Sequence, residues 1–535
     1  SYLSSPLQDG VRTPGNDPSK LKKTAEETAL YSATRSLGKI TIRQIVRLQF
    51  IIRRFIKLQF VICGYSMSDS VFFGRIGELE TLQDAYESAA AEMAIIYGRR
   101  RIGKTALIRK FCEGKPVFFY TARAWKDAFQ LEEFSLAVGT FNHNPQQRFL
   151  DWPAAFRALT AQPGDTRTVI VIDEFQYIAK ERPSILSELQ VLWDEELSRK
   201  NIFLILCGSA VSFIAKEVLG EKNPLYGRAR TIMKVRPLPF QTTAQFVPEC
   251  SVEDAFRGYA VLGGIPYFWQ GINPRRSMTE NLAANVLKAN GFLNDEAQSV
   301  LRQEFRDPST YNAILQAIAF GATTRSEIAQ KSLADSRTLT KYLTVLEDMD
   351  LILREFSVFA GPGDLSNASR GLYRIADPYL KFWFRFLARN PVPVMTRAEA
   401  LSEWRSSVEP FFSEFASEAF EDVCRQYLMR LGRSGQLSFC PSTLGRWWEK
   451  NMEIDIVAAD HERRNCLVGE CKYRNEKVGM KVFRSLQAKC AHLPVADDAV
   501  FHYWLFSRNG FEDSVSELAQ RDPYLHLVGM NDLLD

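Results

Sequence analysis

Three apolar runs stand out in the first half of the chain. They are AEMAIIYG (91–98), TVIVIDE (168–174) and NIFLILCGS (201–209), and each ends in glycine or polar residues. Unbroken runs of this kind are typical of strands that are buried on both faces of a parallel sheet. A helical pattern follows the first run. The pattern therefore predicts an α/β core with the polar strand ends gathered at one edge.

Residues 311–355 show three apolar helical patterns and then the β-rich sequence LILREF. This order predicts a winged helix-turn-helix with a candidate recognition helix at 336–349. The acidic residues Glu347, Asp348 and Asp350 at its end leave a protein-facing or regulatory role as open as DNA binding. The exposed face of the helix is expected to carry Arg337, Thr338, Thr340 and Lys341.

Aromatic residues are concentrated in the segment 371–390. Tyr379, Phe382, Trp383 and Phe386 recur at helical spacing. Aromatic side chains in that arrangement form a core or a domain interface more often than a platform for nucleic-acid bases. The segment is therefore interpreted as a helical connector.

Composition narrows the class of protein. The chain has 535 residues, 46% hydrophobic and 24% charged, which suits a soluble protein of several domains. Its 67 basic and 63 acidic residues give a net charge of +4, so nucleic-acid binding has to be local. Nine scattered cysteines without a CxxC pair indicate neither zinc nor disulfides, and they favour a reducing, cytoplasmic location.

The first 66 residues differ from the rest. Arginine and lysine interrupt the apolar segment 41–62, which argues against a membrane span but leaves a basic surface helix open. The favoured interpretation is that Met67 is the natural start and that residues 1–66 come from an extended reading frame or an added segment.

The sequence GRRRIGKT (98–105) has the spacing of a phosphate-binding loop between a strand and a helix. Gly98 and Gly103 allow backbone N–H groups to face phosphates, Lys104 reaches the terminal phosphates, and Thr105 offers a hydroxyl to magnesium. The three arginines inside the motif, 99–101, are interpreted as solvated charges. The motif predicts binding of ATP with Mg²⁺.

Two carboxylates end the second apolar run. Asp173 is expected to hold magnesium together with Thr105, and Glu174 is expected to deprotonate the attacking water. Ser209, at the end of the third run, could bond the γ-phosphate or the water. Arg228 is either an arginine finger or a partner in a structural ion pair.

A second group of chemically useful residues lies near the C-terminus. EIDIV places Asp455 in an apolar strand, and GECKY places Glu470 and Lys472 on one face of the next strand. Two carboxylates and a lysine can bind Mg²⁺ or Mn²⁺ and activate water against a phosphodiester. Glu421, in the preceding helix, is a further candidate metal ligand, and Gln487 is interpreted as a surface residue.

Taken in order, FFGRIGELETL, YGRRRIGKT, VIDEFQY, CGSAVSF, NPLYGR and LGGIPYF resemble the motifs of archaeal-type ATPases of the AAA+/STAND clade, also found in bacteria. The resemblance covers about residues 70–535. It implies that Gly74 and Arg75 lie near the adenine and that Gly264 and Pro266 belong to a lid over the nucleotide. The domain that commonly follows has a PD-(D/E)XK nuclease-like fold, with Glu421, Asp455, Glu470 and Lys472 at matching positions.

The expected architecture is a multidomain α/β protein. Its parts are an N-terminal extension (1–66), an AAA+-like P-loop core with a parallel sheet (67–240), a helical lid (241–306), a winged helix (307–360), an aromatic connector (361–410) and a restriction-endonuclease-like domain (411–535). The expected function is a nucleotide-controlled ATPase switch coupled to a DNA-binding, nuclease-like tail. A regulatory module that binds DNA or a protein partner, or forms a homo-oligomer, without cutting is the alternative.

Overall fold

The computed structural model describes residues 72–534 except 162–165, 221–222, 306, 367–369 and 389–393. The expectations for residues 1–66 and for Met67 lie outside the described residues. Everything described belongs to the unit Phe72–Asp535.

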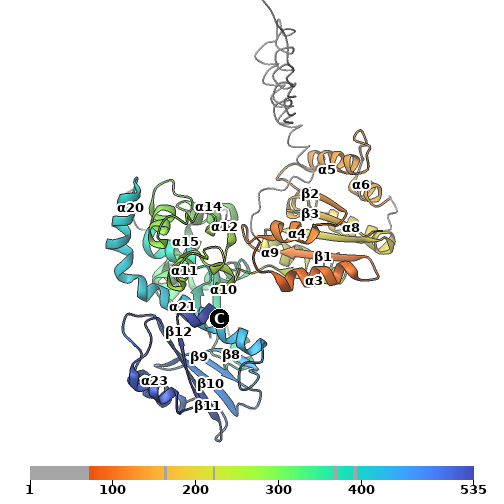
Figure 1. Ribbon diagram of the computed structural model, residues 1–535. Coiled ribbons are helices and arrows are strands. Elements are labelled where there is room, and N and C mark those ends of the chain that lie inside the picture. The colour runs from red at the N-terminus through yellow and green to blue at the C-terminus, as the bar shows by residue number, and fades with distance from the viewer. Residues whose placement is uncertain are drawn as a thin grey trace, which may run out of the picture. The chain divides into compact units, whose positions relative to one another are not determined.

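The first sheet contains the three predicted strands and is parallel throughout. Its five strands follow the order β2-β3-β4-β1-β5, so β4 lies between β1 and β3 (Figure 1). The predicted P-loop type α/β core is confirmed at this level. The strands are β1 (Glu92–Tyr97), β2 (Val117–Thr121), β3 (Thr168–Asp173), β4 (Ile202–Gly208) and β5 (Thr231–Lys234).

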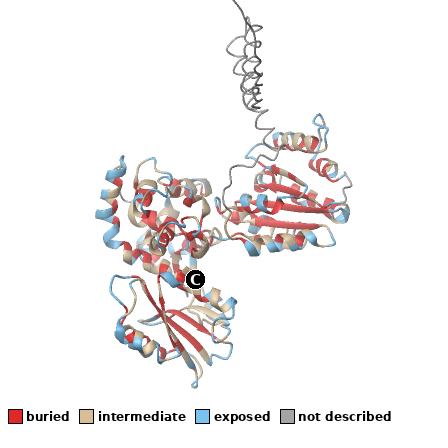
Figure 2. Ribbon diagram, viewed as in Figure 1, coloured by how far each residue is buried: buried red, intermediate tan, exposed pale blue. Residues whose placement is uncertain are grey.

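Alternating side chains of these strands enter two separate cores. In β1, Ala94 and Ile96 pack with α3 (Ile76–Glu87) and α4 (Lys104–Cys112), whereas Met93 and Ile95 face the other cluster. That second cluster includes α5 (Asp127–Phe141), α6 (Trp152–Leu159) and α8 (Ile185–Glu195). Because both faces are covered, the three inner strands β1, β3 and β4 are almost wholly buried (Figure 2).

Helices follow the first sheet. They include α9 (Val211–Phe213), continued by the π-helical turn Ile214–Val218, then α10 (Phe240–Ala244), α11 (Val252–Leu262), α12 (Pro266–Trp269), α13 (Met278–Leu282) and α14 (Glu296–Glu304). Next come three helices and an antiparallel hairpin. These are α15 (Ser309–Ala319), α16 (Arg325–Ser332), α17 (Ser336–Asp348), β6 (Ile352–Glu355) and β7 (Leu372–Ile375).

The aromatic segment forms α19 (Pro378–Phe382) and the π-helical turn Trp383–Leu387. Tyr379 and Phe382 are buried, and the Phe382 ring stacks on Trp404 with ring centroids 5.6 Å apart. Tyr379 and Phe382 therefore lie in a packed core, one of the two arrangements expected for this segment. The helices α20 (Arg397–Glu403) and α21 (Glu409–Arg433) follow.

The second sheet is mixed, with the order β12-β11-β10-β9-β8. β8, β9 and β10 pair antiparallel, whereas β10, β11 and β12 pair parallel. α21 contacts this sheet, as does α22 (Met480–Cys490), and α23 (Asp513–Ala519) packs beside β12. The strands are β8 (Thr443–Glu449), β9 (Met452–Ala459), β10 (Asn465–Lys472), β11 (Val500–Ser507) and β12 (Leu525–Gly529).

Candidate functional site

The loop between β1 and α4 requires glycine at both ends. Gly98 has φ +154°, and a Cβ there would lie 2.6 Å from the carbonyl oxygen of Val235. Gly103 has φ +96°, in the region that favours glycine, and it immediately precedes the first residue of α4. The loop therefore leads directly into a helix N-terminus, where free N–H groups and the helix dipole favour phosphate.

Lys104 and Thr105 occupy the first turn of α4. The buried Lys104 ammonium donates to the carbonyl oxygens of Gly98 at 2.9 Å and Arg99 at 3.0 Å. Burial lowers the pKa of Lys104, while neighbouring groups that include Glu174 and Asp173 oppose the shift. The hydroxyl of Thr105 donates to Asp173 Oδ2 at 2.8 Å. The structure thus brings together the two residues expected to hold magnesium.

Glu174 is held at the end of β3 by a small polar network. Its Oε2 accepts a hydrogen bond from Ser209 Oγ at 2.7 Å and another from Gln176 Nε2. Gln176 also donates to Ser209 Oγ at 3.2 Å. Ser209 therefore contacts the candidate base. Gln176 was not predicted, although its position two residues after Glu174 on the following turn is a usable sequence signal.

The residues expected near the nucleotide lie against the same loop. Arg75 donates through Nη2 to the carbonyl oxygen of Ile102 at 3.1 Å. Gly74 lies against Thr242, and a Cβ at Gly74 would be 2.7 Å from its methyl group. A Cβ at Gly103 would lie 3.7 Å from Pro266. Both the Gly74 segment and the α12 segment therefore adjoin the loop.

Gly264 sits beside the segment that leads from β5 into α10. A Cβ there would overlap the backbone of Leu238, at 2.0 Å from its carbonyl oxygen, and Leu238 N donates to Gly264 O at 2.8 Å. This close backbone approach requires glycine.

Two of the three loop arginines, Arg99 and Arg101, are not the solvated charges that the sequence suggested, whereas Arg100 is exposed. Arg99 Nη1 lies 2.6 Å from Asp377 Oδ2, although the alignment is not that of a hydrogen bond. Arg101 forms an ion pair with Glu296 and lies 4.4 Å from the ring centroid of Tyr267. The solvated interpretation fails because Asp377 and Glu296 are buried and need a charged partner.

Arg228 is engaged away from this loop. Its Nε and Nη2 donate to the two carboxylate oxygens of Asp194 at 2.8 and 2.6 Å. Asp194 belongs to α8, so within the chain Arg228 makes the structural ion pair that was one of its two interpretations.

The C-terminal candidate residues meet on adjacent strands of the second sheet. Lys472 Nζ lies 2.7 Å from Glu470 Oε1 and 3.8 Å from Asp455 Oδ2. Asp455 Oδ2 also accepts from the backbone N–H of Cys471 at 2.8 Å. Lys489, on α22, lies 3.0 Å from Glu470 Oε2. Lys489 was not predicted, and Gln487, on the same helix, is exposed.

Glu421 adjoins this group from α21. Burial raises its pKa to about 8, and the Asp455 carboxylate adds to the shift, while Arg446 and Arg425 oppose it. Burial, followed by Glu470, raises the pKa of Asp455 to about 6. Glu421 Oε2 is 3.8 Å from Arg446 Nε. Among residues 72–534 with the gaps given above, no three carboxylate, histidine or cysteine side chains converge as a metal-binding group.

Comparisons with known proteins agree with the geometry of the first site. A family model described as "ATPase domain predominantly from Archaea" matches residues 72–268, and one described as "Archaea bacterial proteins of unknown function" matches residues 383–483. An uncharacterized protein of Methanocaldococcus jannaschii is 30% identical over 421 residues, which cover 78% of this chain and 92% of that protein. The chain belongs to this archaeal-type ATPase family.

Solved structures also resemble the ATPase. A Walker-type ATPase of Pyrococcus abyssi matches 59% of this chain and 96% of its own, with 21% identity and a TM-score of 0.45. The ORC1 protein of Aeropyrum pernix, in complex with DNA, matches 66% of this chain and 97% of its own, with 14% identity and a TM-score of 0.30.

The nucleotide site of the ATPase suits a magnesium ion. The Thr105 hydroxyl and the Asp173 carboxylate are oxygen ligands of the kind that Mg²⁺ prefers, and they already meet beside the phosphate loop.

Among the described residues, none of the helices has the length and the apolar composition that a membrane span requires.

Two substitutions separate ATP binding from hydrolysis. Lys104→Ala should weaken ATP binding about tenfold or more, because a charge-assisted contact to phosphate is lost. Glu174→Gln should retain ATP but lower kcat by about 100-fold or more, since water loses its base. Fluorescent-nucleotide titration and phosphate release measure the two effects, with Lys110→Ala at the exposed end of α4 as control. Undiminished hydrolysis by Glu174→Gln would contradict the assignment of Glu174 as the base that activates water.

The raised pKa of Glu421 predicts a pH-dependent stability. An ordinary glutamate titrates near 4.5, so between that value and about 8 the folded ATPase keeps a proton that the unfolded chain releases. The contribution of Glu421 is therefore complete below the unfolded pKa and is lost as the pH rises through the folded pKa. Glu421→Gln should gain stability relative to the parent protein as the pH rises.

Thermal unfolding followed by circular dichroism across this pH range measures the difference. The exposed Glu414→Gln on the same helix is the control and should run parallel to the parent protein. Parallel curves for Glu421→Gln and the parent protein would contradict the burial of a protonated carboxyl at this position.

Proposed function

We propose that this ATPase is a nucleotide-controlled switch whose ATP site governs a DNA-directed C-terminal half with a nuclease-like site. The observation that carries the proposal is the pairing of loop arginines with acids outside the first sheet. Arg99 and Arg101 flank the phosphate position, and their partners Asp377 and Glu296 belong to later helical segments. A nucleotide that changes the conformation of the phosphate-binding loop would act on both ion pairs.

The partners of these arginines are built into helix ends. Asp377 Oδ1 accepts from the backbone N–H of Leu380 at 3.0 Å and so caps α19. Glu296 is the first residue of α14, and Glu304 ends the same helix. Burial raises the pKa of Glu304, and Arg100 and other nearby basic groups oppose the shift. The loop arginines therefore contact acidic residues at the ends of helices rather than in loops. This arrangement supports the idea that a movement of the phosphate-binding loop is passed on to these helices.

Residues 309–375 supply a candidate DNA-binding element. The order α15, α16, α17 and the β6–β7 hairpin is that of a winged helix-turn-helix, with α17 as the recognition helix. The four residues expected on its free face are exposed: Arg337, Thr338, Thr340 and Lys341.

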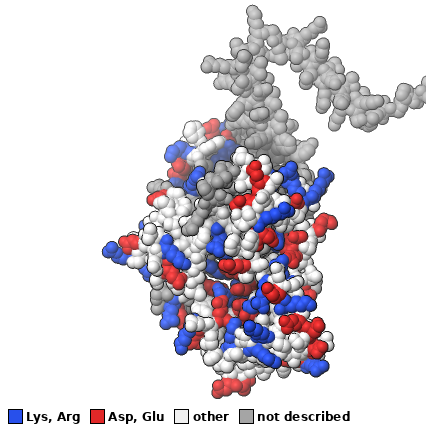
Figure 3. Space-filling view, turned by 90° about the vertical axis from the view of Figure 1, so that its left-hand side faces the viewer, with Lys and Arg blue, Asp and Glu red and all other residues white. Residues whose placement is uncertain are grey.

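The acidic end of α17 does not oppose DNA as the sequence suggested. Asp348 pairs with Lys216 at 2.7 Å and Asp350 pairs with Lys234 at 2.7 Å, both lysines coming from the ATPase core. Each of these two carboxylates is therefore balanced by a lysine of the same chain. The basic face at the beginning of the helix is left to act locally. On the side of the molecule seen in Figure 3, Lys and Arg side chains are interspersed with Asp and Glu side chains.

The second sheet supplies the candidate cleavage chemistry. Asp455 and Glu470 would hold a Mg²⁺ or Mn²⁺ ion, which would polarise a phosphodiester and lower the pKa of a bound water. Lys472, within 4 Å of both carboxylates, is placed to stabilise negative charge on the phosphate. The Glu421 carboxyl is buried, and the nearby charge of Asp455 adds to the rise of its pKa.

One observation favours the alternative, a switch that binds DNA or a protein without cutting. Glu470 is bonded by both Lys472 and Lys489, which can neutralise the carboxylates without any metal ion. The C-terminal sheet would then be a scaffold.

Cleavage of plasmid DNA with Mg²⁺ or Mn²⁺ decides between the two. Asp455→Ala and Lys472→Ala should each lower cleavage by about 100-fold or more, as for loss of a metal ligand or a charge stabiliser. The control is Arg521→Ala, an exposed residue that follows α23. If the parent protein cleaves no DNA with either metal, with or without ATP, the nuclease proposal fails and the alternative, a non-cutting scaffold, holds.

The coupling is tested by Asp377→Asn. Asparagine keeps the helix cap but removes the charge that pairs with Arg99. The ratio of DNA affinities with and without ATP, about 5- to 150-fold for typical coupling, should fall towards one while ATP still binds. Fluorescence anisotropy measures the affinities. The control is Glu196→Gln, which breaks the exposed pair with Arg157, and an unchanged ratio in Asp377→Asn would contradict the coupling.

A further inference from the structure

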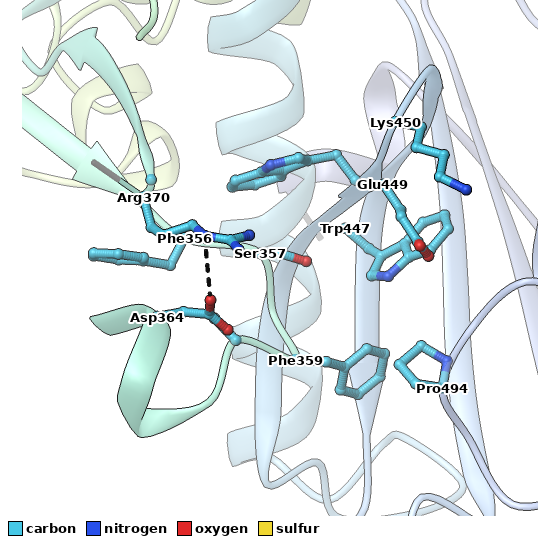
Figure 4. Close-up of a pocket in the computed structure, with 12 residues that line it drawn as sticks. Phe356, Ser357, Phe359, Asp364, Arg370, Trp447, Glu449, Lys450 and Pro494 are labelled. Carbon is cyan, nitrogen blue, oxygen red and sulfur yellow. Dashed lines mark ion pairs between the residues drawn. The ribbon is translucent and has the colours of Figure 1, made fainter. Parts of the chain in front are cut away.

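A cavity of about 440 Å³ lies between the segment that follows β6 and the edge strand β8. Its volume is within the range of about 300–1,000 Å³ found for small-molecule sites. The segment is fixed to the strand because Val358 N donates to Arg446 O at 2.8 Å. Figure 4 shows Phe356, Asp364 and Arg370 on one side and Trp447, Glu449 and Lys450 on the other.

Aromatic rings form much of the lining. Phe356, Phe359, Trp447 and Trp448 all contribute, and Trp447 is buried while the other three are partly exposed to the cavity or solvent. Basic side chains back two of these rings. Arg354 lies 4.7 Å from the centroid of Phe356, and Arg463 lies 4.6 Å from that of Phe359. Rings held in this way can accept a flat aromatic ligand by stacking.

The charges of the lining balance. Asp364 and Arg370 lie on one side and Glu449 and Lys450 on the other, and Arg370 Nε lies 3.7 Å from Asp364 Oδ1. A phosphate would meet two carboxylates here, so the interior does not suit an anion. A neutral ring with donors and acceptors along its edge suits it, because carboxylates, a guanidinium and the Ser357 hydroxyl can bond such an edge.

The cavity adjoins the candidate cleavage site along the same hairpin. Trp447 pairs with Ile454, the residue before Asp455, and Glu449 pairs with Met452 at the hairpin end. At about 3.3 Å per residue, Asp455 is roughly 10 Å along β9 from that end, a length that a few nucleotides span. Arg446, the residue before Trp447, reaches Glu421 at 3.8 Å.

We propose that this cavity binds one unpaired nucleobase of a DNA strand whose backbone lies at the Asp455, Glu470 and Lys472 group. This inference rests on the proposed function and names its substrate class: DNA with an unpaired or displaced base, rather than uninterrupted duplex. A base inside a duplex is stacked on both faces and must leave the stack to enter such a cavity. The segment that follows β6 and the strand β8 would then together distinguish DNA with an unpaired base from uninterrupted duplex.

Binding is measured without cleavage by fluorescence anisotropy of the full chain in EDTA. The probes are a short fluorescein-labelled oligothymidylate and a blunt hairpin duplex with the same number of phosphates. The single strand should bind more tightly. Phe356→Ala and Trp448→Ala should each weaken its binding about fivefold or more, as expected for one lost stack, and leave duplex binding nearly unchanged. The control is Trp125→Ala, another partly exposed aromatic with a neighbouring arginine.

Thermal unfolding and ATP hydrolysis by each variant establish that it is folded. Should an alanine variant fail to fold, Trp448→Phe keeps a stacking ring and should retain binding, whereas Arg370→Ala alters only an exposed side chain of the lining and should weaken it. Equal affinity for both probes, or single-strand binding that is the same in Phe356→Ala, Trp448→Ala and the parent protein, would overturn the proposal.

The outcome of the binding experiment can be distinguished from that of the cleavage test. If the protein binds the single strand through the cavity but cuts no DNA, the base-binding proposal holds and the nuclease proposal fails. Cleavage with unchanged single-strand binding in the pocket variants would retain the nuclease and remove the base site.

Discussion

The parallel register of the first sheet is the constraint on which the ATP site depends. Because β1, β4 and β3 run the same way, their carboxyl ends lie at one edge, and three separate sequence segments deliver side chains there. With β4 between the other two, Ser209 lies where it can bond Glu174, and Thr105 reaches Asp173. Side chains on the strands hold this edge by filling the cores on both faces of the sheet.

Charge is the second organising element. Asp377 is almost fully buried, and a buried carboxylate without a cation is costly, so the Arg99 contact is a condition for the packing of α19 against the ATP site. Breaking one partner of such a pair typically costs about 3–5 kcal/mol. In the proposed switch, a contact of this strength beside the phosphate position would make the conformation of the rest of the chain sensitive to nucleotide.

Much of the site could be predicted because its signals are local. GRRRIGKT and VIDE carry spacing and strand pattern together, and Asp455, Glu470 and Lys472 could be placed on adjacent strands from the strand pattern. The partners of Arg99 and Arg101 could not be predicted, since Asp377 and Glu296 lie far along the chain and their pairing depends on tertiary packing. Lys489 and Gln176 were missed for a related reason: a polar residue on an amphipathic helix looks like a surface residue until its neighbours are known.

The pairing of Val358 with Arg446 has a further consequence. β8 is an edge strand, and its free backbone groups would otherwise offer a template for strand addition by another chain. The segment after β6 covers part of that edge with a strand-like contact from the same molecule. At this point β8 has one backbone carbonyl fewer with which the strand of another chain could pair, so an attachment within the molecule also limits edge-to-edge association of the second sheet.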